Sequence, residues 1–457
     1  MVGTSAKTLT QKHSVSLFLP LYKEINRKKF RLKKSPGPLY VPFGTSVPFH
    51  LWQAKVSSRL HCYFIDHPGL FGRPGLYGYK GDDFQDNDIR FAFYCYALFV
   101  ASKKIDFQPS VIHCHDWQAA LIPAYLKLVF GLDPFFAGTK SVLTVHNNAY
   151  LGLFPSTSFR KTWLPDGQQD FQMGFHISFL KGGIVYADVL NTVSPTYRKE
   201  ILTKPEFGCG LEKTYQQRKA DFWGILNGLD VDYWDTLKDP FLIKRFGPDT
   251  LALRDQCKMD LQKEAGISVN LNTPVLGFVG RIDSQKGIDV LVSLLSAPKL
   301  KKDQFVVLGQ GDAKLEKVLF EIAKKEPRRI HVENEFSESL AHKIYAGCDL
   351  FLMPSRFEPC GLSQMIAMRY GALPVVTPTG GLKDTVVPAS HRKGTGFIAK
   401  ARNASAFQYA VREGLAVLDK PSVRHRLRRA GMKKDFSWDA SIKEYCDLYE
   451  KALAKGN

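Results

Sequence analysis

The stretch TPVLGFVGRIDSQKGIDVLVSLL (residues 273–295) decides the fold class of this 457-residue chain. An apolar run is followed by a polar loop with glycines and then by a second apolar run, which predicts a strand, a loop and a helix. Helices that alternate with strands in this way connect parallel neighbours of one sheet. In open α/β sheets the chemistry lies at the carboxyl ends of the strands, and here the loop GRIDSQKG (280–287) holds that position.

The same alternation extends from this stretch in both directions. Further strands are predicted toward the C-terminus in QFVVLGQGD (304–312), RIHVE (329–333), CDLFLMPS (348–355) and LPVVTP (373–378). Toward the N-terminus they are predicted in SVSLFLPLY (14–22), SVIHCHDW (110–117), SVLTVHN (141–147) and the start of DVLNTVSPTYRKEI (188–201), where Ser194 and Pro195 mark a helix start. The series pauses in polar sequence with Pro and Gly at residues 225–250. We therefore predict an α/β protein with two parallel-sheet domains and a cleft between them.

The composition is that of an ordinary globular protein, with 44% hydrophobic and 23% charged residues. No apolar run approaches the roughly 18 residues of a membrane span, and the first apolar run is too short and broken by Pro20 to be a signal peptide. The eight cysteines show no CxxC spacing, which favours a reducing compartment over zinc or a disulfide framework. We expect a cytoplasmic protein with no membrane partner.

The chain is strongly basic, with 63 Lys and Arg against 44 Asp and Glu and a net charge of +19. Two clusters contribute, NRKKFRLKK (26–34) and RHRLRRAGMKK (424–434). Such clusters could attract an anionic partner such as nucleic acid. Because neither has interleaved aromatic residues on which bases stack, solvated surfaces are the better interpretation, and we expect no nucleic-acid partner.

The segment PSRFEPCGLSQMIAMRYG (354–371) is predicted to end a strand, pass through a loop with Glu358 and start a helix near Gly361. The free N–H groups at the start of such a helix suit a phosphate or sugar hydroxyl groups. Glu358 could then bind hydroxyl groups or balance positive charge on a reacting sugar. A carboxylate that simply caps the helix explains the spacing equally well.

Arg281 and Lys286 share the loop that follows the strand of the opening stretch. A planar guanidinium and a mobile ammonium both suit a diphosphate, and the leaving group of a nucleotide sugar is a diphosphate. Two cations there would stabilise the developing negative charge without a metal. Two solvent-exposed cations in a surface loop are the simpler alternative.

A glycine pair occurs in TPTGGLKDTV (377–386), one strand beyond Glu358. Thr379, Gly380 and Gly381 precede a predicted helix, so bare backbone N–H groups can approach an anion closely. The pair alone is weak evidence. Its place in the chain makes it a second wall of the same pocket.

HCHDW (113–117) holds two histidines and an aspartate at a predicted strand end. Alternation along a strand places His113 and His115 on one face, so a two-histidine metal clamp is geometrically possible. No further ligands occur at recognisable spacing, and sugar binding by Asp116 is the preferred interpretation. His146 ends the next strand and could face the same cleft, although a lone histidine at a strand end is usually structural.

The motifs together resemble those of bacterial glycogen synthase and plant starch synthase, in the order HCHDW, TVHNNAY, ILNGLD, GRIDSQKG, PSRFEPCGLSQ and TGGLKDTV. The resemblance runs from the first helix to DFSWDASIKEYCDLYEKAL near the C-terminus. It implies the GT-B fold, with two Rossmann-like domains. It also implies transfer of glucose from ADP-glucose, or UDP-glucose, to the non-reducing end of an α-1,4-glucan such as glycogen or starch. Configuration would be retained, and neither metal nor cofactor would be needed.

The resemblance also implies roles for individual residues. Arg281 and Lys286 would contact the distal phosphate and the leaving oxygen, and Glu358 would lie over the donor glucose. Asp116 and His146 would contact the acceptor and donor sugars. The other implied substrate contacts are Asn227 at the hinge, Cys360 in a structural role, the amides of Gly361 and Leu362, and the diphosphate loop of Thr379, Gly380, Gly381 and Leu382.

By the same resemblance we expect three segments. Residues 1–235 would form the acceptor-side domain, residues 236–434 the nucleotide-sugar domain, and residues 435–457 a helix that crosses back onto the first domain. The opening MVGTSAKTLTQKHSVSLFLPLY (1–22) is predicted to be a helix and a strand. Because the family begins earlier, with a strand and a Lys-x-Gly-Gly-Leu-x-Asp loop, we expect that segment to be missing through a start assigned too late.

Two other functions stay open at this point. A synthase of the same architecture could transfer glucose to a small sugar, although PSRFEPCGLSQ and TGGL disfavour this. A chain without the donor-phosphate loop could also be an inactive, glucan-binding homologue. For an active enzyme, no carboxylate is evident for a covalent double displacement, so a same-face substitution guided by the leaving phosphate is the better hypothesis.

Overall fold

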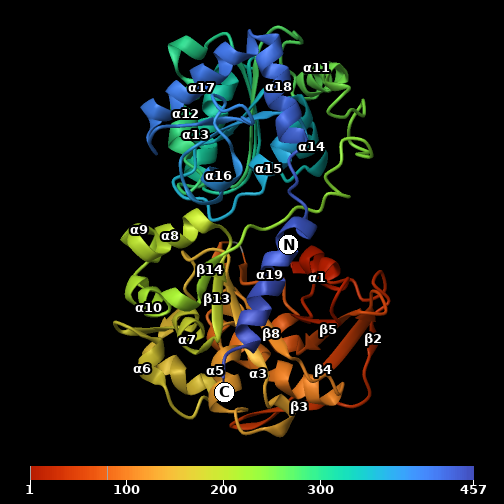
Figure 1. The fold of residues 1–457 in the computed structure, drawn as a ribbon, viewed down its shortest axis with the longest axis vertical. Helices are drawn as coiled ribbons and strands as arrows, with labels where there is room; N and C mark the ends of the chain where they lie inside the picture. The colour runs from red at the N-terminus through yellow and green to blue at the C-terminus, as the bar shows by residue number, and fades with distance from the viewer. Residues whose placement is uncertain (1, 80, 457) are drawn as a thin grey trace. The chain divides into compact units, whose positions relative to one another are not determined.

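The computed structural model describes residues 2–79 and 81–456, and the chain divides into two compact units (Figure 1). Unit 1 comprises Met1–Val193, Arg198–Ile225 and Ser441–Asn457. Unit 2 comprises Ser194–Tyr197 and Leu226–Ala440. Each unit is an α/β body with its own sheets, so each is described by itself. The last helix, α19 (Trp438–Leu453), belongs to unit 1 from Ser441 onward.

Unit 2 is built on a six-stranded parallel sheet. Its order is β17 (Ile330–Glu333), β16 (Gln304–Leu308), β15 (Val275–Val279), β18 (Leu350–Met353), β19 (Leu373–Val376) and β20 (Phe397–Ile398). From β15 the chain first builds outward through β16 and β17, and then returns to place β18 on the other side of β15. This reversal is a topological switch point, where ligands of open α/β sheets bind. The loops that follow β15 and β18 meet there.

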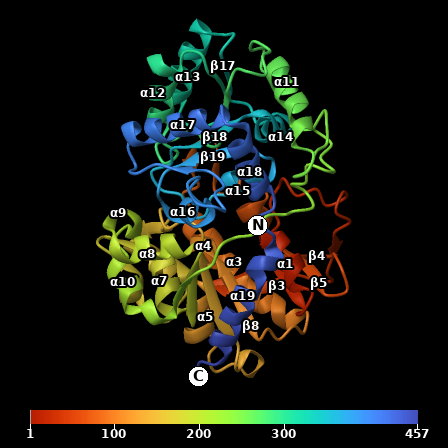
Figure 2. The same cartoon turned by 45° about the horizontal axis from the view of Figure 1, so that its top comes forward.

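Helices cover both faces of this sheet (Figure 2). One face carries α12 (Ile288–Leu295), α13 (Ala313–Lys325) and α17 (Ala404–Leu418). The other carries α11 (Arg254–Glu264), α14 (Glu338–Gly347), α15 (Ser363–Arg369) and α18 (Pro421–Met432), and α16 (Gly380–Thr385) follows β19. A sheet buried on both faces needs nearly continuous apolar strands, as in β18 and β19, whose residues are all buried.

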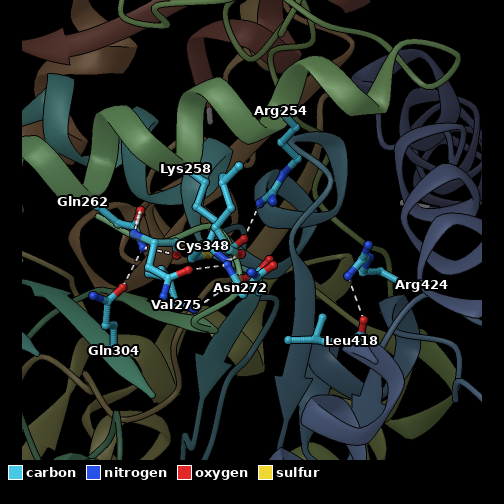
Figure 3. Close-up of polar contacts among 12 residues, drawn as sticks. Arg254, Lys258, Gln262, Asn272, Val275, Gln304, Cys348, Leu418 and Arg424 are labelled. Atoms are coloured by element: carbon cyan, nitrogen blue, oxygen red, sulfur yellow. Dashed lines mark hydrogen bonds and ion pairs between the residues drawn. The ribbon is translucent and has the colours of Figure 1, made fainter. Parts of the chain in front are cut away.

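A buried charge network lies at the opposite end of this sheet, and Figure 3 labels Arg254, Lys258 and Val275 among the residues drawn there. The Asp349 carboxylate accepts hydrogen bonds from Lys258 Nζ at 2.6 Å, Arg428 Nη2 at 2.8 Å and the backbone N–H of Val275 at 3.0 Å. Nearby, Arg254 donates to the carbonyl of Tyr370 at 3.0 Å. Burial raises the pKa of the Asp349 carboxyl, but Lys258, Arg428 and Arg254 together hold it below its usual value. Because Asp349 directly precedes β18 and Val275 begins β15, the network lies at the amino ends of these strands, away from the carboxyl ends, and is structural.

Unit 1 contains two larger sheets. The first is parallel throughout, in the order β14 (Phe222–Gly224), β13 (Val189–Thr192), β9 (Lys140–Val145) and β8 (Val111–His115). The second places β1 (Val15–Pro20) parallel to β5 (Leu60–Asp66), with β4 (Thr45–Lys55) antiparallel to β5, and β2 (Lys33–Lys34) and β3 (Leu39–Phe43) antiparallel to β4. Helices α3 (Asn87–Lys104), α5 (Ile122–Leu128) and α7 (Phe179–Tyr186) connect and cover the strands.

The antiparallel strands of residues 33–66 correct the expectation of purely parallel sheets. Gly44 joins β3 to β4 with a left-handed backbone, at φ +68°. The short connection after β4 closes on a hydrogen bond from Val56 N to Leu60 O. Tight turns of this kind reverse the chain directly, whereas parallel neighbours need a helical crossover. No helix separates these strands, and that absence was the signal in the sequence.

The other predicted elements of both series are confirmed. All nine predicted strands form, and the helix α1 (Val2–Leu9) precedes β1. The helix α8 (Pro195–Thr203) begins after Ser194, whose hydroxyl accepts from Tyr197 N at 3.0 Å. The basic helix α18 exposes His425, Arg426 and Arg429 to solvent, whereas Arg428 of the same cluster is buried in the charge network. Within the described residues, no helix combines the length and apolarity needed to cross a membrane.

Candidate functional site

In unit 2 the loop after β15 places Lys286 at the switch point. The carboxylate of Asp283 accepts a hydrogen bond from the backbone N–H of Lys286 at 2.9 Å, which turns the chain. Gly287 follows with φ +70°, and a Cβ there would lie 2.1 Å from the carbonyl oxygen of Pro354. Only glycine permits this close approach. The loop after β15 is therefore pressed against the loop after β18.

Lys286 and Glu358 form an ion pair across these two loops. Lys286 Nζ lies 2.6 Å from Glu358 Oε2, and the hydroxyl of Ser355 donates to the same oxygen at 3.0 Å. The Glu358 side chain is only 8% exposed and that of Lys286 18%, so the pair is largely shielded from water. A shielded pair interacts more strongly than an exposed one.

The contacts of Glu358 do not support the helix-cap alternative. The α15 helix begins at Ser363, two residues later than predicted, and its N-cap residue Leu362 provides no side-chain cap. Glu358 is held instead by Lys286 and Ser355. Its place beside a cation agrees with a role in binding, although its contact with a sugar stays a prediction.

The Arg281 side chain contacts two residues of its own loop. Its guanidinium pairs with Asp283 at 2.9 Å and donates to Gln285 Oε1 at 2.9 Å. The side chain is half-exposed, at 51%. Arg281 and Lys286 therefore share Asp283 as a neighbour, one through its side chain and the other through its backbone N–H. A phosphate contact for Arg281 stays a prediction.

The glycine pair packs directly on the loop of Glu358. At Gly380, with φ +43°, a Cβ would lie 2.0 Å from the carbonyl oxygen of Glu358, and at Gly381 one would lie 1.9 Å from the carbonyl oxygen of Cys360. The N–H of Gly381 donates to the Glu358 carbonyl at 3.1 Å. Gly380 and Gly381 are thus the first residues of α16, with Thr379 as N-cap and Leu382 buried in its first turn. The glycines have a packing reason of their own, and the diphosphate contact of this loop stays a prediction.

Cys360 is suited to a structural role. Its side chain is buried, and burial raises the pKa of the thiol to about 12, against a lowering contribution from the backbone N–H of Asn227. A thiol with such a pKa is protonated at neutral pH and is a poor nucleophile. Gly361 has φ +68°, and a Cβ there would approach Gln364 Oε1 to 2.4 Å. The backbone N–H of Asn227 reaches the Cys360 thiol, and a substrate contact for Asn227 stays a prediction.

In unit 1 the carboxyl ends of β8 and β9 bring together His115, Asp116 and His146. His115 Nδ1 lies 3.1 Å from His146 Nε2, and Asp116 Oδ1 accepts from the backbone N–H of His146 at 2.7 Å. Asp116 has φ +56°, a left-handed conformation that a non-glycine residue adopts only when its surroundings hold it there. His113 and His115 share one face of β8, as alternation predicts, with ring centroids 4.3 Å apart.

Burial keeps this group of imidazoles neutral. It lowers the pKa of His113 to about 3, and it lowers the pKa values of His115 and His146 as well, with neighbouring imidazoles adding to the effect at His113 and His115. Burial also raises the pKa of Asp116, and this rise is opposed by the neighbouring His146 side chain and by the backbone N–H groups of His146 and Asn147. Neutral imidazoles offer one donor and one acceptor each, which suits sugar hydroxyl groups.

The metal interpretation of HCHDW finds no ligand set. Both ring nitrogens of His113 are occupied, Nδ1 by Tyr449 Oη at 2.8 Å and Nε2 by Thr144 Oγ1 at 2.6 Å. Across residues 2–79 and 81–456 no group of three or more His, Cys, Asp or Glu side chains is arranged to hold a metal ion. The sequence interpretation gave no role to Thr144, Ser355 or Tyr449, although each lies within a quoted motif, because their side-chain contacts form only in the folded chain.

Comparison with known proteins agrees with this arrangement. Residues 1–217 match the family model of the starch synthase catalytic domain, and residues 262–434 match that of glycosyl transferases group 1. The chain is 41% identical to glycogen synthase 2 of Geobacter metallireducens over 442 residues, covering 96% of this chain and 91% of that protein. It is also 41% identical to glycogen synthase of Elusimicrobium minutum, covering 100% of this chain and 96% of that protein.

Solved structures are also similar to this chain. The catalytic domain of starch synthase IV from Arabidopsis thaliana, bound to ADP and acarbose, superimposes with a TM-score of 0.90 at 30% identity, covering 99% of this chain and 95% of that one. Sucrose-phosphate synthase from Thermosynechococcus elongatus, at a TM-score of 0.61 and 16% identity, shares the fold alone. The fold and the site thus define a glycosyltransferase of the GT-B class. Within that class, the chain belongs to the family of bacterial glycogen synthases and plant starch synthases.

Proposed function

We propose that this protein transfers glucose from ADP-glucose to the non-reducing end of an α-1,4-glucan with retention of configuration. The observation that carries the proposal is the shielded Lys286–Glu358 pair at the switch point between β15 and β18. Family membership supports the choice of reaction. The neighbouring starch synthase was solved with ADP, and this supports an adenine nucleotide donor over UDP-glucose.

In the proposed reaction Lys286 contacts the phosphate oxygen that leaves with ADP. The bond between this oxygen and the anomeric carbon breaks, and the terminal 4-hydroxyl oxygen of the glucan forms the new bond on the same face of the sugar. The hydroxyl proton passes to the leaving phosphate. An ammonium group in a shielded site stabilises the charge that develops on this oxygen. Glu358, 2.6 Å from Lys286, supports the positive charge of the reacting sugar.

In unit 1, His146 and Asp116 are proposed to bind sugar hydroxyl groups. The neutral state of His146 favours hydrogen bonding over proton transfer as its task. No step in this scheme uses a metal or an organic cofactor. The eight cysteines are all free thiols, which supports a cytoplasmic location.

The decisive experiment measures incorporation of radiolabelled glucose from ADP-glucose into glycogen. Parallel reactions use UDP-glucose as donor, glucose 6-phosphate as acceptor, or EDTA in the buffer. We expect incorporation into glycogen that is faster with ADP-glucose and insensitive to EDTA. Incorporation into glucose 6-phosphate alone would identify a synthase for a small acceptor. Glycogen binding without any incorporation would identify an inactive homologue.

A further inference from the structure

A directed chain of hydrogen bonds anchors the histidines of β8 to the C-terminal helix α19. Thr144 Oγ1 donates to Asn191 Oδ1 at 2.6 Å, because an amide oxygen can only accept. The Thr144 oxygen therefore accepts from His113 Nε2, at 2.6 Å, which places the His113 proton on Nε2. Nδ1 of His113 is then an acceptor, and the Tyr449 hydroxyl donates to it at 2.8 Å. The network itself assigns this tautomer.

The anchored ring of His113 packs against the ring of His115. The two residues are neighbours on one face of β8, and their ring centroids lie 4.3 Å apart with an interplanar angle of 33°. The parallel register pairs His115 with Thr144 of β9, so His146 emerges just beyond this pair. His115 is therefore fixed by its strand and by His113 before it meets His146.

The contact between His115 and His146 determines what His146 offers to a ligand. At 3.1 Å one nitrogen must donate and the other accept, because both rings are neutral. If His115 Nδ1 donates, the proton of His146 lies on Nδ1. If His146 Nε2 donates, Nδ1 of His146 is an acceptor. In either case His115 fixes the character of the opposite nitrogen.

That opposite nitrogen lacks a hydrogen-bond partner within the described part of the chain. Nδ1 of His146 is buried and unpaired among residues 2–79 and 81–456. Buried polar atoms are normally hydrogen-bonded, so an unpaired one at the carboxyl end of a strand indicates a ligand contact. A sugar hydroxyl can be donor or acceptor and so matches either state of Nδ1.

We infer that His115 is a positioning residue for His146, fixing the ring and tautomer of His146 so that its Nδ1 meets a hydroxyl group of the transferred hexose. Tyr449 of α19 holds the other end of this histidine row, which consists of His113, His115 and His146, through its hydrogen bond to His113. The inference rests on the proposed function and deepens it, because it assigns a task to a histidine that need not touch the sugar.

The test compares His115→Phe with His115→Asn in the full chain. Phenylalanine keeps a ring to stack on His113 but removes the contact to His146, whereas asparagine keeps a polar atom near the place of Nδ1. With ADP-glucose and glycogen, we expect His115→Phe to lower kcat by about 10- to 100-fold. We expect the kcat of His115→Asn to stay within about fivefold of that of the unmodified protein. Inhibition by ADP, which carries no glucose, should change by less than about twofold in both.

Two results would overturn the inference. One is an unchanged kcat in His115→Phe. The other is an equal loss in both variants together with weaker ADP inhibition, since damage to the fold, rather than to the position of His146, would produce it. A second measurement works even if the unmodified protein transfers no glucose and the proposed function fails. In histidine-selectively ¹⁵N-labelled protein, the His146 ring signals should shift in His115→Phe, and unchanged signals would contradict the inference.

Discussion

Replacing Lys286 by methionine separates the contribution of the ion pair to stability from its contribution to turnover. The substitution keeps an unbranched apolar stem that is one atom shorter and removes the ammonium group that lies 2.6 Å from Glu358. Ser355 still donates to the same carboxylate oxygen at 3.0 Å. The variant therefore leaves Glu358 with one of its two described polar partners.

The expected loss in the free energy of unfolding follows from how deeply the Lys286–Glu358 pair is buried. Breaking a fully buried ion pair costs about 3–5 kcal/mol, and an exposed pair is worth about 1 kcal/mol or less. Lys286 is 18% exposed and Glu358 8%, and the hydrogen bond from Ser355 remains. We therefore expect a loss of about 2 kcal/mol in the free energy of unfolding. Domains of this kind have about 5–15 kcal/mol of stability, so the variant should stay folded at 25 °C.

Turnover should fall much further than stability. Removing one group that stabilises developing charge lowers kcat by about 10²- to 10³-fold. Urea unfolding gives the stability, and radiolabelled incorporation into glycogen gives kcat. Glu358→Gln serves as the matched variant, and the double variant closes a thermodynamic cycle. Because the two side chains touch, the sum of the stability losses of Lys286→Met and Glu358→Gln should exceed the loss of the double variant by about 1 kcal/mol or more.

Two results would contradict these roles of Lys286. If Lys286→Met retains more than about half of the original kcat, Lys286 does not contact the leaving phosphate. If the stability costs of the two single variants add within about 0.3 kcal/mol, the pair is not coupled as its distance indicates.

Tyr449→Phe removes the donor to His113 Nδ1 and should lower the free energy of unfolding by about 1–2 kcal/mol, with faster amide exchange in α19 as the direct measurement; unchanged exchange would contradict the anchor. Gly380→Ala forces a Cβ against the carbonyl of Glu358 and should cost more than about 3 kcal/mol, whereas Gly266→Ala, which also has positive φ but open space, should cost about 1 kcal/mol in urea unfolding. The pKa of His113 is about 3 when folded and near 6.5 when unfolded, so the unfolded state binds the proton and stability falls as the pH drops below 6.5. His113 alone should remove about 2 kcal/mol between pH 7.5 and pH 5, and a flat pH profile of unfolding over this range would exclude a buried neutral imidazole.

The alternation of apolar runs and helical stretches was enough to predict both α/β series. Strand polarity then placed the loops of Arg281, Glu358 and Gly380 at the carboxyl ends, since parallel strands all end at one edge. The hairpins of residues 33–66 were missed because the order of residues along the chain does not show which strands pair. Their antiparallel register is set only when the strands come together in the sheet. The start of α15 was misplaced by two residues, which is the usual uncertainty of a helix end.

The sequence by itself determined the fold class, the family and the set of polar residues at the strand ends, because strand direction and motif spacing are local properties of the chain. Only the tertiary structure decided which of these residues meet. Lys286 and Glu358 pair across 72 positions of sequence, and His113 and Tyr449 across 336. Such contacts depend on how separate elements pack, and no local preference encodes their distance or burial. The histidine row and its anchor on α19 therefore became visible only in the folded chain.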